Sequence, residues 1–85
     1  MNGSIKDIEK VRAVHPEYFN AGSIISIGRS TGSNMWLVGA TTNSYFLALL
    51  ISYYNSDSLV SCRGSGSSGT MTYEYRRVLM NTYTP

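Results

Sequence analysis

The chain has 85 residues, of which 42% are hydrophobic and 14% charged, and its formal net charge is +2. This length predicts a single domain, residues 1–85, and so small a charge does not by itself indicate a nucleic-acid-binding protein. Few charges together with many apolar residues indicate that part of the surface is covered by a partner, which includes further copies of the same chain.

The N-terminal segment 4–14, SIKDIEKVRAV, carries apolar residues at spacings that a short helix and an irregular strand share. The segment ends at His15-Pro16, because the residue before a proline favours extended geometry. The polar start of the chain, which includes Lys6 and Asp7, lacks the apolar core of a signal peptide. We therefore expect a cytoplasmic protein, unless a leader has been removed.

Two β-branched stretches follow and predict a hairpin. GSIISIGRS (22–30) and MWLVGAT (35–41) read as strands, and TGSN (31–34) between them is typical of a turn.

The uncharged run NSYFLALLISYYNS (43–56) is the most apolar part of the sequence. Its apolar centre of about 10 residues is too short to span a bilayer, which needs ~20. A segment of ~13 residues is also long for a strand, and Thr42 or Asn43 is a suitable N-cap, so we predict a helix over 43–55. Apolar residues surround most of this helix, and a domain this small can cover only one side of it. The other side predicts an oligomer interface, made by Phe46, Leu47, Leu50, Ile51, Tyr53 and Tyr54.

The last third of the chain predicts two further strands, SLVSCR (58–63) and MTYEYRRVLM (71–80), joined by the loop RGSGSSGT (63–70). The second strand alternates, with Met71, Tyr73, Tyr75, Arg77 and Leu79 on one side.

The order of these elements predicts an α+β, mainly β fold. If the N-terminal segment is a strand, the order β-β-β-α-β-β matches the OB-fold, a five-stranded Greek-key barrel, here with one apolar helix. If it is a helix, the same sequence fits an open ββ-α-ββ sheet with an N-terminal helix.

Catalytic chemistry finds little support in the residues. The one histidine, His15, lies in a turn near Glu17, and a solvated turn histidine is the favoured interpretation. The carboxylates show no paired or metal-ligating spacing, and no nucleophile elbow occurs. We therefore expect no enzyme, no metal and no cofactor, and we expect the lone Cys62 to be a buried, inert thiol in a strand.

Two ligand classes remain open. Abundant hydroxyl and amide groups with tyrosines suit a glycan, whereas an OB-type single-stranded nucleic-acid binder or protein-interaction subunit is the alternative. The residues available for nucleic acid are Arg63, Arg76, Arg77, Trp36 and Tyr73.

A longer pattern runs from residue 4 into the apolar segment. A serine and an Ile-rich N-terminal segment precede the pair Tyr18-Phe19, and an Ile-rich strand then leads through the turn Gly32-Ser33 to a strand ending in small residues. An apolar segment with Tyr53-Tyr54 near its end completes the pattern. In this order the chain resembles the B-subunit family of the subtilase cytotoxin and typhoid toxin, AB5-type toxins, although the disulfide that joins the family's hairpin strands has no cysteines here.

The resemblance implies an OB-fold subunit in a homopentameric ring, with helices around the pore and strands pairing across subunits. It also implies that Ser4 contacts a sialylated glycan. The expected function is thus a non-enzymatic, self-assembling binding module for a glycan; a subunit whose partner is only itself, or a larger chain docked on its ring, is a further possibility.

Overall fold

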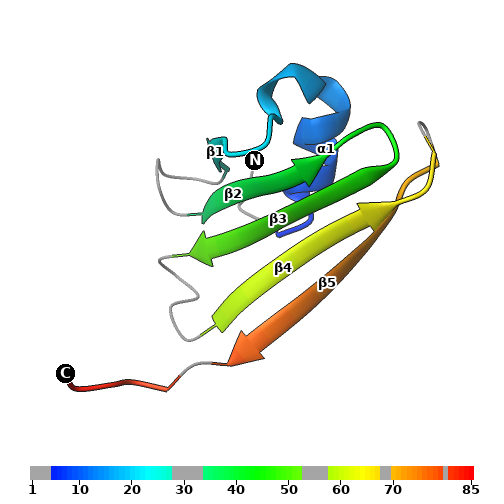
Figure 1. Cartoon of the computed structure of the whole chain (residues 1–85). Helices are drawn as coiled ribbons and strands as arrows, with labels where there is room; N and C mark the ends of the chain where they lie inside the picture. Colours follow the sequence, from blue (N-terminus) through cyan, green and yellow to red (C-terminus); the bar gives the residue numbers. More distant parts are fainter. Residues whose placement is uncertain (1–4, 28–33, 53–57, 68–69, 80) are drawn as a thin grey trace.

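The computed structural model describes residues 5–27, 34–52, 58–67, 70–79 and 81–85. Within these residues the chain forms the helix α1 (Asp7–Val14), the short 3-10 turn η1 (Pro16–Tyr18) and the strands β1 (Ile24–Ser26), β2 (Asn34–Thr41), β3 (Tyr45–Ser52), β4 (Ser58–Ser65) and β5 (Thr72–Leu79). Every strand pairs antiparallel with its neighbour in sequence, so the sheet is an open meander with β1 and β5 at its edges (Figure 1).

The helix predicted over residues 43–55 is wrong, because Tyr45–Ser52 is β3, the central strand of the sheet. Burial alternates along β3: Phe46 and Leu50 are 2% and 1% exposed, whereas Leu47 and Ile51 are 47% and 57% exposed. Both faces of the strand carry apolar side chains, so the sequence shows no alternation of apolar and polar residues. An uninterrupted apolar run of this kind fits a strand or a helix equally well.

The predicted order β-β-β-α-β-β and the closed barrel are also wrong. The helix comes first, before all described strands, and the sheet is open. The mainly β class is confirmed, as are the strands at 35–41, 58–63 and 71–80, to within two residues at each end. The alternative, an open ββ-α-ββ sheet with an N-terminal helix, is right in its open sheet and N-terminal helix and wrong in its second helix, which is β3. β1 covers only the middle of the strand predicted over 22–30, and part of that prediction lies outside the described residues.

The N-terminal segment forms a helix for local electrostatic reasons and because one side of it is apolar. Asp7 and Glu9 lie in its first turn and Arg12 in its last. The acidic groups are near the partly positive N-terminus and the guanidinium is near the partly negative C-terminus, so these charges stabilise the helix. The helix ends before His15, where the following proline disfavours helical geometry. Ile8 is fully buried and fixes α1 against the sheet.

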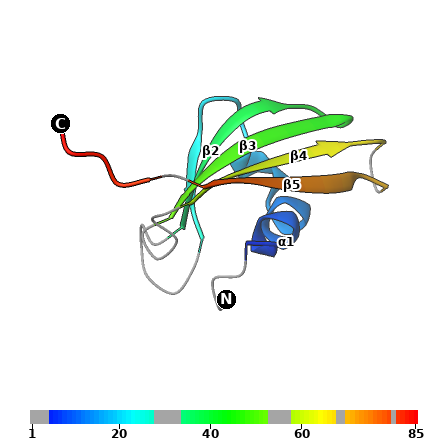
Figure 2. The same cartoon turned by 90° about the horizontal axis from the view of Figure 1, so that it is seen from below.

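The core lies between α1 and the face of the sheet that we call the inner face. In Figure 1, α1 lies behind the sheet, and Figure 2 shows it beneath the strands. The buried hydrophobic side chains come from α1, from β2, β3 and β4, and from the segments around β1, and they are Ile8, Phe19, Ile27, Trp36, Val38, Phe46, Ala48, Leu50, Val60 and Cys62. Tyr73 and Tyr75 of β5 pack against this core, and Glu74 and Arg76 point to the other side, which confirms the predicted alternation.

Adjacent residues of β3 provide a sharp test of this architecture. Replacing Leu50 by alanine should lower the free energy of unfolding by ~2–5 kcal/mol, because it leaves a cavity in the core. Replacing Ile51 by alanine should lower it by less than ~1 kcal/mol, because this side chain is exposed. Urea titration at low protein concentration measures both values. Equal losses at the two positions would contradict the strand assignment.

Candidate functional site

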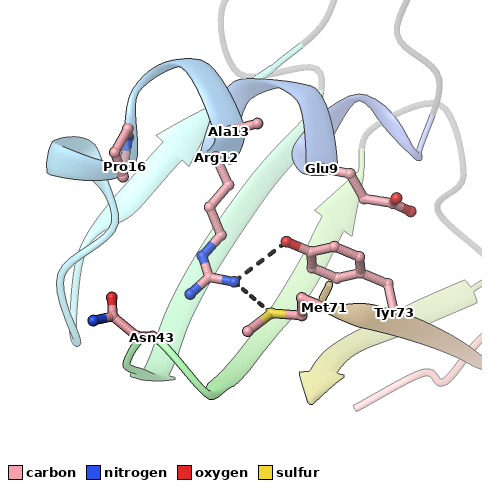
Figure 3. A pocket seen from close by; sticks show the side chains of 7 residues that line it. All are labelled: Glu9, Arg12, Ala13, Pro16, Asn43, Met71 and Tyr73. Carbon is pink, nitrogen blue, oxygen red and sulfur yellow. Dashed lines mark hydrogen bonds between the residues drawn. The ribbon is translucent and has the colours of Figure 1, made fainter. Parts of the chain in front are cut away.

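A pocket of about 490 Å³ lies between α1 and the end of the sheet where β2 turns into β3 (Figure 3). This volume falls within the range of small-molecule sites, ~300–1,000 Å³. Seven residues line it: Glu9, Arg12, Ala13, Pro16, Asn43, Met71 and Tyr73. The pocket therefore combines two charged groups, an amide and a phenol with an apolar wall.

Arg12 is the central charged group of the pocket. Its Nη1 atom donates to Met71 Sδ at 2.8 Å and to the Tyr73 hydroxyl at 3.3 Å. Its Nη2 atom donates to the Thr42 carbonyl at 2.8 Å and to Thr41 Oγ1 at 3.3 Å. One arginine thus connects the helix to the β2–β3 turn and to the start of β5.

An aromatic ring completes the surroundings of the guanidinium. Arg12 Cζ lies 4.5 Å from the centroid of the Phe46 ring, a cation–π distance. Phe46 in turn contacts Phe19 and Tyr73 edge to face, with centroid distances of 5.8 and 6.1 Å. The cation is therefore held over the aromatic part of the core.

A glycine opposite Phe46 makes room for the pocket wall. Gly64 pairs with both Phe46 and Tyr73 in the sheet. A Cβ atom at this position would lie 2.7 Å from Met71 Sδ and 3.1 Å from Tyr73 Cδ1, closer than van der Waals contact allows. The positions of Met71 and Tyr73 at Arg12 thus depend on Gly64.

Within the pocket wall, Glu9 is bound by Tyr75 and not by Arg12. The Tyr75 hydroxyl donates to Glu9 Oε2 at 2.5 Å. Burial raises the pKa of the Tyr75 phenol, and the hydrogen bond to Glu9 raises it further. Tyr75 pairs with Cys62, and burial raises the pKa of that thiol to about 11. The predicted buried thiol in a strand is confirmed.

The opposite, outer face of the sheet is apolar over β1, β2 and β3. Ile24, Leu37 and Leu49 form one cross-strand row, and Met35 and Ile51 belong to the next. No described helix or strand covers this face, which looks toward the viewer in Figure 1. We call it the outer apolar surface, and it consists of Ile24, Met35, Leu37, Leu47, Leu49 and Ile51.

Toward β4 and β5 the outer face becomes charged. Arg63 Nε and Arg76 Nε both donate to Glu74 Oε1, at 2.9 and 3.0 Å. These bonds, with the bond to Arg76 contributing most, lower the pKa of Glu74. The cluster is solvated, so it contributes little to stability.

The predicted site residues fall into three groups. Ser4, Tyr53 and Tyr54 lie outside the described residues. Phe46 and Leu50 are in the core and cannot contact a second copy, whereas Leu47 and Ile51 are exposed on the outer face. The predicted helix would place these residues on one surface, whereas the strand divides them between the inner and the outer face of the sheet.

The residues considered for nucleic acid do not form one surface. Trp36 is 1% exposed and unavailable for base stacking. Arg63 and Arg76 lie on the outer face, whereas Tyr73 faces the pocket on the inner side. Arg77, which pairs with the buried Val60, is exposed on the same side of β5 as Tyr73.

His15 stays at the surface, as predicted. Its Nδ1 atom lies 3.3 Å from Glu17 Oε1, and its ring stacks on Tyr18 with a centroid distance of 4.6 Å.

Sequence reasoning did not identify Arg12, Asn43 or the pocket that they line. A signal for Arg12 exists, because it lies four residues after Ile8 and thus on the same side of α1. A charged residue in the apolar stripe of a short helix indicates a specific partner. Asn43 carries no comparable signal, since turns commonly contain asparagine.

Comparison with models of protein families, with curated proteins and with solved structures found no match. Within the described ranges, no group of three or more His, Cys, Asp or Glu side chains is arranged to hold a metal ion. The helices described between residues 5 and 85 are too short and too polar to cross a membrane.

The raised pKa of Cys62 predicts a loss of stability in alkali. The folded chain holds the thiol proton more tightly than the unfolded chain, so this contribution is complete below pH 9.0 and is lost as the pH rises toward 11. Urea unfolding as a function of pH should show stability falling from pH 9 upward. In Cys62→Ala the fall should begin about one pH unit higher, near pH 10, because the raised pKa of Tyr75 then sets the onset. An unchanged onset would contradict the assignment.

Proposed function

We propose that this chain is a non-enzymatic binding module that self-associates through its outer apolar surface and binds a glycan. The observation that carries the proposal is the exposure of Ile24, Leu37 and Ile51, at 62%, 44% and 57%, on one face of the sheet. A contiguous apolar surface of this kind marks an interaction site more often than it remains in water.

The size of the outer face determines how much of it a second copy must cover. Four strands of eight residues and the three-residue β1 give a face of roughly 550 Å² at ordinary strand rise and spacing. Each partner in a stable complex contributes ~800 Å². The outer face is smaller than this, so a second copy must cover the whole face and also residues at its rim, as when two sheets pack into a sandwich. Two copies that pack the same face on each other close a dimer, so the ring of five that the resemblance implies needs a further, head-to-tail contact between subunits.

The pocket residues suit a glycan better than the exposed arginines suit a nucleic acid. Asn43, Tyr73 and Glu9 supply amide, hydroxyl and carboxylate groups, and Ala13 and Pro16 supply an apolar wall. Sugars present hydroxyls and apolar ring faces, which need both kinds of contact. The arginines considered for nucleic acid are divided between faces and partly neutralised by Glu74.

Self-association is tested by adding a charge to the outer apolar surface. Leu37→Glu and Ile51→Glu should each weaken association by ~100-fold or more, because an unpaired carboxylate would be buried between the copies. Light scattering at micromolar concentration gives the mass, and circular dichroism checks that the fold is kept.

Lys10→Glu is the matched control, since Lys10 is exposed on α1, which packs against the inner face, away from the outer apolar surface. It should leave the mass unchanged. A monomeric wild-type chain at micromolar concentration would refute self-association and leave a partner of different sequence as the occupant of this surface.

The ligand class is tested with a glycan array followed by a salt titration. Affinity for a glycan should change less than ~3-fold between ~50 and 200 mM salt, whereas affinity driven by phosphate contacts falls steeply over this range. Ser4→Ala tests the contact implied by the toxin resemblance. Absence of any array signal, together with steeply salt-dependent binding of single-stranded DNA, would replace the glycan with nucleic acid.

A further inference from the structure

The partners of Arg12 are all uncharged. Its guanidinium contacts a thioether, a phenol, a threonine hydroxyl, a carbonyl and an aromatic ring. The ion pairs within the described residues join His15 to Glu17, and Arg63 and Arg76 to Glu74, and none of them includes Arg12. A partly buried cation is stabilised by an anionic partner, and the described part of the chain does not supply one here.

The acceptors at Arg12 Nη1 are weak ones. A thioether sulfur is a poor acceptor, and the bond to the Tyr73 hydroxyl is long at 3.3 Å. The Tyr73 hydroxyl accepts from Arg12 and donates its own proton to no acceptor in the described ranges. A carboxylate placed between these two groups would accept from both.

The nearest carboxylate does not fill this role. Glu9 lines the pocket, but its Oε2 atom is bound to the Tyr75 hydroxyl at 2.5 Å. Figure 3 shows the Glu9 carboxylate directed away from the guanidinium, whereas Tyr73 and Met71 point toward it. Within the described residues no carboxylate takes the position beside Nη1, which leaves it open to the anion of a ligand.

We infer that the pocket binds a sugar acid of the hexuronate class, with its carboxylate between Arg12 and Tyr73. A charged group accepting from arginine and from a phenol makes stronger hydrogen bonds than the thioether that it displaces. The sugar hydroxyls meet Asn43 and Glu9, and the ring lies along the wall of Ala13 and Pro16. This inference rests on the proposed glycan binding and specifies the ligand within that class.

The test compares D-glucuronate, D-glucose and acetate in titrations of the wild-type chain followed by nuclear magnetic resonance. Glucuronate should shift the amide signals of Arg12, Asn43 and Tyr73, and it should bind roughly 10- to 100-fold more tightly than glucose, because only glucuronate pairs with the guanidinium. Acetate should compete for the same signals at higher concentration.

Two variants locate the carboxylate. Arg12→Met keeps an unbranched, apolar side chain as far as the position of Nε and removes the guanidinium, and Tyr73→Phe keeps the ring against Phe46 and removes the hydroxyl. Each should weaken glucuronate binding, Arg12→Met by roughly 10- to 100-fold. Arg76→Met on the outer face is the matched control and should not change it. If Arg12→Met does not fold, Tyr73→Phe and the comparison of the three probes decide whether the carboxylate binds in this pocket.

Three results would overturn the inference: equal affinity for glucose and glucuronate, unchanged binding by a folded Arg12→Met variant, or no shift at the pocket with either carboxylate probe. A neutral glycan bound equally by wild type and Arg12→Met would overturn the sugar acid but keep the proposed glycan binding. Self-association is measured by mass and is independent of all three.

Discussion

The structure depends on the packing of one eight-residue helix against one face of the sheet. Ile8 contributes the apolar contact, and Arg12 adds hydrogen bonds that reach the β2–β3 turn and the start of β5. Because the helix is short, it is stable only where this face of the sheet supports it. The core, the pocket and the orientation of β5 all follow from this contact.

A single short helix can cover only one face, and this explains why the other face matters. β3 passes through the centre of the sheet with Phe46 and Leu50 on the inner side and Leu47 and Ile51 on the outer side. In a two-layer domain the outer side of such a strand is normally polar. Its apolar character here extends across β1, β2 and β3, and a second copy packed on this face would complete a sandwich.

The pocket arises where the same helix meets the end of the sheet. Gly64 allows Met71 and Tyr73 to approach Arg12, and the ring of Phe46 supports the guanidinium from the core. The residues that attach the helix are thus also the residues offered to a ligand. Binding of an anion at Arg12 would therefore also strengthen the contact between α1 and the sheet, since a ligand that binds only the folded state stabilises it.

Several features were determined by the sequence itself. The alternation of Tyr73, Glu74 and Tyr75 identified β5, the apolar setting of Cys62 identified a buried thiol, and His15-Pro16 marked the end of the first element. Each depends on interactions within a few residues, which local patterns record. Only the tertiary structure decided that residues 45–52 are a strand, because apolar side chains on both faces remove the period that distinguishes a strand from a helix. The pocket, likewise, brings together Arg12, Asn43 and Tyr73, which are about 30 residues apart in the chain, and no local pattern records a contact over that separation.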